Sequence, residues 1–245
     1  MLSHYEKFFD VVEINYTFYT MPHIHTFGSF LERTRRLLFS VKVNRIFTHD
    51  RSYTVKDREL FLNAVKPVLE SGRFIALLFQ FPQSFHYSPE NMEYIGKLSR
   101  DFADIDKVIE FRSRSFNRVE VFEEIESLGF SVVNVDAPKL RGIFLGPWKS
   151  VGTVNYIRLH GRNAEKWHKG EEAYERYDYL YSEGELEEIK RKIERLDGEL
   201  DTFVFFNNHY RGKGALNALQ LKALFGEDVS FPRGLASLSA PRLWE

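Results

Sequence analysis

VIEFR (Val108–Arg112) has the alternation of apolar and polar side chains that is typical of a short β-strand. Side chains of a strand point to opposite faces with a period of two, so Glu110 and Arg112 share one face and their apolar neighbours share the other. Six further segments also place polar residues at their C-terminal ends: VVEIN (Val11–Asn15), FSVKVN (Phe39–Asn44), ALLFQF (Ala76–Phe81), VVNVD (Val132–Asp136), YIRLH (Tyr156–His160) and FVFFNN (Phe203–Asn208). Buried parallel strands are normally almost continuously hydrophobic, so these polar ends, which share one parity, predict a lined pocket.

Helical patterns alternate with these strands, at about residues 3–9, 26–36, 57–71, 89–101, 118–128, 182–196 and 215–225. Repeating βα units predict an α/β fold with a parallel sheet and right-handed crossovers. The chain has no glycine-rich nucleotide-binding motif, and nearly every strand ends in polar residues. A TIM-barrel-like (β/α)8 fold is therefore favoured over an open doubly wound sheet. Only seven strands are visible, so we expect a barrel that lacks its first strand.

Composition narrows the class of protein. The 245 residues contain no linker or low-complexity segment, which predicts a single domain over residues 1–245 with an irregular tail at about 231–245. Lys+Arg 34 against Asp+Glu 35 gives a net charge of -1, which argues against a broad nucleic-acid footprint. The absence of cysteine excludes disulfides and is typical of a cytoplasmic protein. No apolar run approaches the roughly 20 residues that span a bilayer, so no membrane partner is expected.

Several longer blocks carry a family resemblance. They are VEINYTFY (Val12–Tyr19), FSVKV with Thr48 and His49, FQFP (Phe79–Pro82), IEFRSRSF (Ile109–Phe116), YIRLHG (Tyr156–Gly161), Tyr181-Ser182 and FFNNHYRGKGALNAL (Phe205–Leu219). In this order they resemble the DUF72 (YecE-like, UPF0759) family. The resemblance implies a TIM-barrel-like fold and no established activity. A relationship to endonuclease IV-like, metal-dependent barrels is an analogy of fold only. The family usually opens with a strand carrying a G-T-S-G-W-like motif, which is missing here.

Four residues are candidates for acid–base chemistry: His160, Glu110, Asp136 and Glu13. His160 is the first choice for proton transfer because imidazole titrates near neutrality, although a lone histidine is more often structural. Glu110 and Arg112 can clamp a polar substrate or satisfy one another as a salt bridge. Glu13 is expected to face Lys42 on the neighbouring strand. That pair is either a base beside an anion-binding cation or a structural ion pair.

The last strand and the loop after it predict an anion site. TIM barrels often bind phosphate with the loops after their last two strands and a nearby helix N-terminus. Here Arg211, Gly212, Lys213 and Gly214 precede a helix expected from Ala215. The alternative is that Arg211 and Lys213 are solvated charges of the loop. The full set of candidate ligand-binding residues is Asn15, Lys42, Gln80, Arg112, Arg158, Asn207, Asn208, Arg211 and Lys213.

Cofactor and activity stay open at this point. Glu110, Asp136 and His160 would be the ligands of a divalent metal, but the site residues contain no H-x-H or H-E-x-x-H pair, so no metal is assigned. The expected partner is a phosphorylated or anionic small molecule. One alternative is a phosphoester hydrolase or sugar-phosphate isomerase. Another is a non-catalytic protein that binds nucleic acid or a metabolite, since Tyr16, Phe18 and Tyr19 are placed to stack on bases. A third is an inactive barrel kept as an interaction protein.

Overall fold

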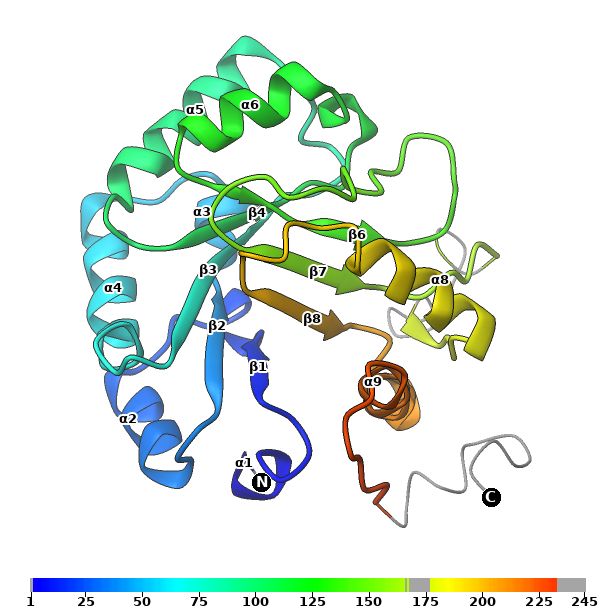
Figure 1. The fold of residues 1–245 in the computed structure, drawn as a ribbon. Coiled ribbons are helices and arrows are strands. Elements are labelled where there is room, and N and C mark those ends of the chain that lie inside the picture. Colours follow the sequence, from blue (N-terminus) through cyan, green and yellow to red (C-terminus); the bar gives the residue numbers. More distant parts are fainter. Residues whose placement is uncertain (1, 166, 168–176, 233–245) are drawn as a thin grey trace.

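The strands of the chain form two parallel sheets that follow one another in sequence. The computed structural model describes residues 2–165, 167 and 177–232. The first sheet contains β1 (Val11–Ile14), β2 (Leu38–Lys42), β3 (Phe74–Gln80), β4 (Lys107–Glu110) and β5 (Ser131–Val132) in that order. The second contains β6 (Asn134–Asp136), β7 (Asn155–Leu159) and β8 (Thr202–Phe206). All pairings between these strands are parallel, so the expected parallel α/β fold is confirmed (Figure 1).

The strands occupy the seven positions that the sequence predicts, because β5 and β6 are consecutive pieces of one predicted strand. Val133 separates them, and its backbone N–H still donates to the carbonyl of Ile109 on β4 at 3.0 Å. The chain therefore continues from the first sheet to the second without a crossover.

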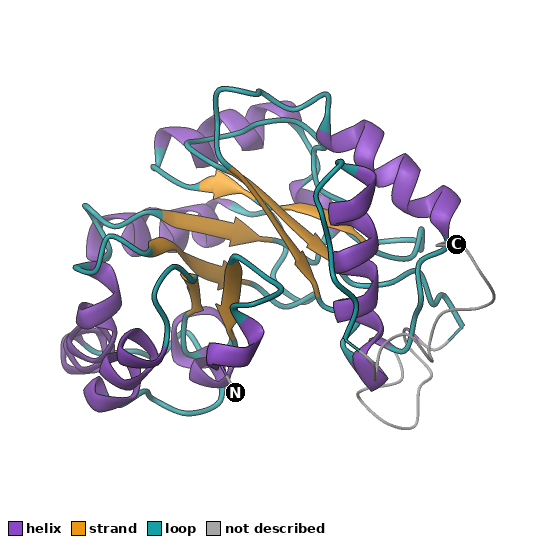
Figure 2. Ribbon diagram, turned by 60° about the horizontal axis from the view of Figure 1, so that its bottom comes forward, coloured by secondary structure: helices purple, strands orange, loops and turns teal. Residues whose placement is uncertain are grey.

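Helices flank the strands on the outside (Figure 2). They are α1 (Leu2–Tyr5), α2 (Ile24–Arg33), α3 (Arg45–Thr48), α4 (Val55–Leu69), α5 (Pro89–Asp101), α6 (Val119–Ser127), α8 (Glu183–Ile193) and α9 (Lys213–Leu224). Local sequence sets where several of them begin. Thr54 and Asp57 form a capping box at α4, and Glu185 accepts hydrogen bonds from the backbone N–H and hydroxyl of Ser182 at α8. None of the helices in the described ranges has the length and hydrophobicity that a membrane crossing needs.

The first helix is shorter than its pattern predicts. It ends at Tyr5, and the carboxylate of the next residue, Glu6, accepts the backbone N–H groups of Arg35, Arg36 and Leu37 at 2.8, 2.6 and 3.0 Å. These bonds satisfy donors at the connection between α2 and β2.

Aromatic packing fixes the first sheet against its helices. The ring of Phe102, directly after α5, lies edge-on to Phe47 at 5.3 Å and to Phe79 of β3 at 5.1 Å, and Phe61 of α4 completes the group. All four side chains are fully buried. Edge-to-face aromatic pairs stabilise a core beyond the area that they bury, so β3 and its neighbours form a firm support for the polar strand ends.

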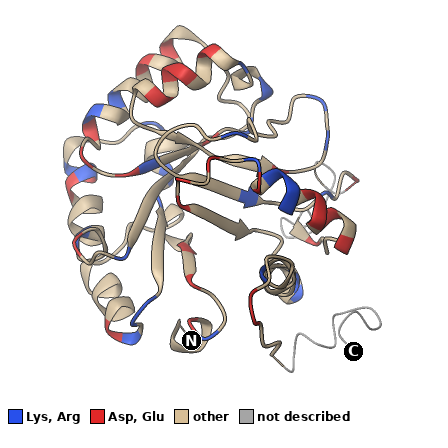
Figure 3. Cartoon of the chain, in the orientation of Figure 1, with Lys and Arg blue, Asp and Glu red and all other residues tan. Residues whose placement is uncertain are grey.

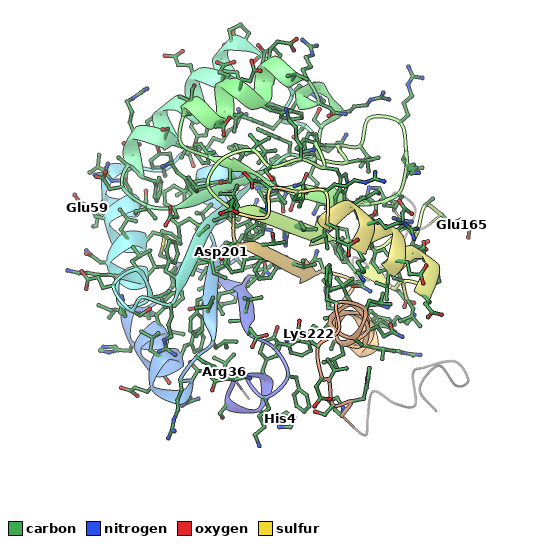
Figure 4. All side chains as sticks on the ribbon, in the orientation of Figure 1. His4, Arg36, Glu59, Glu165, Asp201 and Lys222 are labelled. Carbon is green, nitrogen blue, oxygen red and sulfur yellow. The ribbon has the colours of Figure 1, made fainter. Side chains whose placement is uncertain are left out.

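The barrel is not closed by backbone pairing between its first and last strands. β1 and β8 are the outer strands of their sheets, and no described strand lies between them. Lys222, labelled in Figure 4, extends from α9 toward the segment before β1, and its ammonium lies 2.6 Å from Asp10 Oδ2. We call the unpaired region between β1 and β8 the seam. It agrees with the sequence expectation of seven strands rather than eight.

Candidate functional site

A cavity of about 1060 Å³ opens at the C-terminal ends of the strands and extends along the seam. Its seam side is mainly apolar and includes Phe9, Phe203 and Phe225. Its polar side contains seven of the predicted site residues: Glu13, Asn15, Lys42, Gln80, Arg112, Arg158 and Asn207. Most other charged residues lie on the outer helices (Figure 3), so the interior charges form a distinct group.

Arg158 is the centre of this group. Its side chain is 2% exposed, and its Nε and one terminal nitrogen contact the two carboxylate oxygens of Glu13 at 2.9 and 2.6 Å. The other terminal nitrogen lies 2.5 Å from Glu110 Oε2. Burial opposes ionisation of Glu13 and Glu110, but attraction to Arg158 outweighs it and holds the pKa of each carboxyl below its ordinary value. The three residues form a buried, mutually compensated ion triad.

Glu110 also joins Arg112 and His160 to the triad. Arg112 Nε donates to Glu110 Oε1 at 2.8 Å, which confirms the predicted contact between these two residues. His160 Nε2 lies 3.2 Å from the same oxygen, and its Nδ1 lies 3.1 Å from Asn207 Nδ2. Because the amide nitrogen donates, Nδ1 is the acceptor and the imidazole proton resides on Nε2.

The surroundings of His160 keep its ring neutral. Burial, followed by the charge of Arg112, lowers the pKa of His160 to about 4. The ring is fully buried, with Trp167 and Tyr177 nearby at centroid distances of 6.5 and 6.4 Å. Neither His160 nor Glu110 lines the cavity. His160 and Glu110 lie behind the residues that line the cavity, and Glu110 holds the lining residues Arg112 and Arg158 in place. Proton transfer by His160 or Glu110 stays a prediction.

Lys42 differs from Arg112 and Arg158 in having no carboxylate partner among the residues that the structure describes. Its Nζ donates to Gln80 Oε1 at 2.7 Å and lies 4.3 Å from the centroid of the Phe18 ring. The expected contact between Glu13 and Lys42 is wrong as a salt bridge, because Arg158 reaches across the barrel and occupies both oxygens of Glu13. Burial and then the nearby charge of Arg158 lower the pKa of Lys42 to about 7.

Asp136 does not face the interior, so the single parity assumed for all strands is wrong here. In the register of β6 with β7, Asp136 pairs with Leu159, on the face that packs under α8, whereas Arg158 pairs with Val135. The Asp136 carboxylate binds Arg162 through two contacts of 2.9 and 2.7 Å and accepts the Tyr181 hydroxyl at 2.9 Å. Asp136 therefore belongs to an outer network beside α8.

The conditional metal set is consequently not assembled. Glu110 and His160 lie on the inner face, but Asp136 lies on the other face of the sheet. Within the described ranges, no group of three or more His, Cys, Asp or Glu is placed to hold a metal ion.

The loop after β8 also differs from the prediction. Asn208 is buried away from the cavity, where its amide donates to Tyr179 O at 2.8 Å and to Asn217 Oδ1 at 3.0 Å. Lys213 begins α9, two residues earlier than expected, and pairs with Asp178 at 2.5 Å. Arg211 is exposed on the loop. The cavity is lined here by Gly212, Gly214 and Ala215, not by the two cations.

Other residues that line the cavity were not in the predicted site set, among them the ring side chains of Tyr177 and His209. Their rings lie 5.5 Å apart, and His209 Nδ1 contacts the carbonyl of Asn207 at 3.0 Å. The motif FFNNHYRG contains His209, so its position after the last strand was a usable signal. Tyr177 lies outside any strand pattern and has no comparable signal.

The fold and the charged strand ends define a TIM-barrel-like protein with a polar mouth, and the comparisons with known proteins agree. The chain belongs to the DUF72 family, described as a protein of unknown function, whose model matches residues 1–240. The UPF0759 protein YunF of Bacillus subtilis is 30% identical over 253 residues, covering 94% of this chain and 88% of that protein.

Solved structures of the family share the fold. A DUF72 family protein of Thermotoga maritima is 37% identical, with a TM-score of 0.80 over 89% of this chain and 85% of that one. A DUF72 family protein of Enterococcus faecalis, 24% identical, has a TM-score of 0.85 over 94% of this chain and 90% of that one. The TIM-barrel-like expectation is thus confirmed, and the names of these relatives assign no substrate.

Proposed function

We propose that the mouth of the barrel binds a small organic anion through a phosphate or carboxylate group. The observation that carries this proposal is the charge balance of the interior. Lys42, Arg112 and Arg158 supply three cations, whereas Glu13 and Glu110 supply two carboxylates whose oxygens are all engaged by the two arginines and by neighbouring donors. Lys42 in its charged form is therefore uncompensated, and a bound anion would supply the missing charge.

Arg112 supplies a second reason. Its Nε is held by Glu110, but its two terminal nitrogens have no hydrogen bond or ion pair with the part of the chain that the structure describes. Trp167 lies over the guanidinium, 5.9 Å from its carbon to the ring centroid, and helps to hold its plane. A guanidinium presented in this way suits the paired oxygens of carboxylate or phosphate. Asn15, Gln80 and Asn207 add neutral polar groups to the same cavity.

The other functional hypotheses have less support. Phosphoester hydrolysis and sugar-phosphate isomerisation remain predictions, since His160 and Glu110 lie outside the cavity lining and are bonded to one another. The alternative of nucleic-acid binding has less support because Arg211 and Lys213, the cations of the predicted anion loop, do not line the cavity beside the aromatic residues. The net charge of -1 supplies no broad basic surface in compensation.

Calorimetric titration with inorganic phosphate and with acetate tests the proposal. Arg112→Gln removes the guanidinium and is expected to weaken binding about 10- to 100-fold, the equivalent of one or two charge-assisted hydrogen bonds. Arg33→Gln is the matched control, since Arg33 is exposed on α2 and does not line the cavity. The proposal is wrong if neither anion binds the wild type, or if both variants weaken binding equally while remaining folded.

A further inference from the structure

The amine of Lys42 has surroundings that differ from those of an ordinary ion-paired lysine. It is reached from the cavity, yet among the described residues its amine contacts the amide oxygen of Gln80 and the face of Phe18 and no carboxylate. No described carboxylate lies within salt-bridge distance of its Nζ. A lysine that is desolvated and placed beside other cations is driven toward its neutral form, and the neutral amine is the nucleophilic form.

The charges around Lys42 come from several elements and act together. The charged and titratable groups near it are Glu13 of β1, His49 after α3, Glu110 of β4, Arg112 after β4 and Arg158 of β7. The two glutamates favour the ammonium, but their charge is already neutralised by Arg158 and Arg112. Burial and the charge of Arg158 therefore prevail and lower the pKa of Lys42 to about 7.

We propose that Lys42 is a nucleophile that forms an imine with a small aldehyde or ketone bearing a carboxylate or phosphate group. The inference rests on the proposed anion site, because Arg112 would hold the anionic end while the carbonyl carbon meets Lys42 in the same cavity. The amine nitrogen bonds to the carbonyl carbon, and the carbonyl oxygen leaves as water with the two protons that the nitrogen loses. The products are one imine and one water, so no oxidant or reductant is needed.

The partners of Lys42 also leave its amine free to lose a proton. A salt bridge to Glu13, the carboxylate that the neighbouring strand offers, would keep Lys42 protonated and unreactive. Arg158 instead occupies both oxygens of Glu13. The same arrangement leaves Lys42 with a neutral acceptor, Gln80, which can hold an amine as well as an ammonium.

Reductive trapping tests the inference directly. The full-length protein is incubated with glyoxylate, an anionic aldehyde, and cyanoborohydride, which reduces the imine to a stable secondary amine. Peptide mapping then compares Lys42 with Lys56, an exposed lysine of α4 that does not line the cavity. At pH 7 the fraction of neutral amine at Lys42 exceeds that of a lysine at the ordinary value of 10.5 about a thousandfold. We expect Lys42 to be the first residue labelled.

Two further arms separate this inference from the anion site on which it rests. Lys42→Arg keeps the charge and removes the nucleophile, so it should retain phosphate binding in calorimetry and lose the adduct. Inorganic phosphate should slow the labelling of wild-type Lys42, and neutral acetaldehyde should label it more slowly than glyoxylate.

The outcomes have separate meanings. If the wild type binds phosphate but Lys42 is labelled no faster than Lys56, the imine inference is overturned and the anion site stands. If Lys42 is labelled selectively but phosphate neither binds nor protects, the nucleophile stands and the anionic substrate class is overturned. If neither phosphate binding nor selective labelling occurs, both proposals are wrong.

Discussion

Replacing Arg158 by methionine tests whether the interior is the compensated ion triad described above. The substitution keeps most of the aliphatic length of the side chain and removes the guanidinium that contacts both Glu13 and Glu110. Because these carboxyls are 6% and 0% exposed, water cannot replace the lost guanidinium. Removing one partner from a buried ion pair costs about 3–5 kcal/mol, a large part of the roughly 5–15 kcal/mol that stabilises a typical domain.

The loss of stability in Arg158→Met should also depend on pH, and the pKa shifts of Glu13 and Glu110 determine whether it grows or shrinks as the pH rises. In the wild type, the pKa values of Glu13 and Glu110 lie below the ordinary 4.5, so their ionised forms contribute stability above that value. This contribution is lost as the pH falls through the lowered pKa values. In Arg158→Met, Glu13 loses its cationic partner and Glu110 keeps only Arg112, so burial raises the pKa of each carboxyl relative to the wild type. The difference in free energy of unfolding between wild type and variant should therefore grow from about pH 5 to about pH 8.

Urea unfolding followed by circular dichroism at both pH values measures this difference. Arg36→Met is the control for loss of an arginine, because the contact of Arg36 with Asp10 is exposed on both sides and is worth under about 1 kcal/mol. A double variant, Arg158→Met with Glu13→Gln, should recover part of the stability, since Glu110 keeps its contact with Arg112 and Glu13 no longer carries a charge. A loss below about 1 kcal/mol for Arg158→Met that is equal at both pH values would refute the reasoning. So would a double variant less stable than the single one.

Three further outcomes are expected. Sulfate binding, measured by calorimetry, should weaken as the pH rises through the Lys42 pKa of about 7, because Lys42 then loses its positive charge. A sulfate affinity that is constant from about pH 6 to about pH 9 would contradict the role of Lys42 in anion binding. Nitrogen NMR should show His160 neutral, with its proton on Nε2, down to about pH 5, since its pKa is about 4. A titration of His160 near pH 6.5 would show that the ring is not buried as described. Gly146→Ala should lower the free energy of unfolding by about 2 kcal/mol more than Gly72→Ala. Both glycines have positive φ, but a Cβ at Gly146 would lie 2.6 Å from the Val135 nitrogen, whereas a Cβ at Gly72 would have no atom within 4 Å. Equal losses in thermal melts would contradict this reasoning.

Local alternation was enough to predict the strands and much of the polar mouth. Glu13, Lys42, Gln80, Arg112 and Arg158 were assigned to one face, and they do line one cavity. The prediction for VVNVD was wrong because both faces of this strand are buried, so its pattern gives no sign of which face is interior. Val135 takes the inner position beside Arg158, and Asp136 turns to the outer face, where Arg162 satisfies it.

The partners of the interior charges were harder to predict than their face. Sequence order makes β1 and β2 neighbours, which favoured a pair between Glu13 and Lys42. The observed partner of Glu13 is Arg158 of β7, a contact that requires the sheets to curve until β1 and β7 face one another. The alternation of side chains along a strand predicts neither the curvature of the sheets nor the length over which Arg158 extends. The position of Lys213 in the expected phosphate loop was mispredicted for a similar reason, since Lys213 pairs with Asp178, which lies in a segment with no strand pattern.

The seam has a consequence for how the cavity responds to its solvent. Across the seam, side-chain ion pairs take the place of the hydrogen-bond ladder that joins neighbouring strands elsewhere. Glu13 of β1 contacts Arg158 of β7, and Asp10, just before β1, contacts Lys222 of α9. The outer pair, Lys222 with Asp10, is 22% and 54% exposed and is screened by salt, whereas Arg158 with Glu13 is buried and is screened much less. We therefore expect rising ionic strength to weaken the contact at the rim of the seam more than the contact at its inner end. Salt should thus change access to the cavity more than the affinity of its interior.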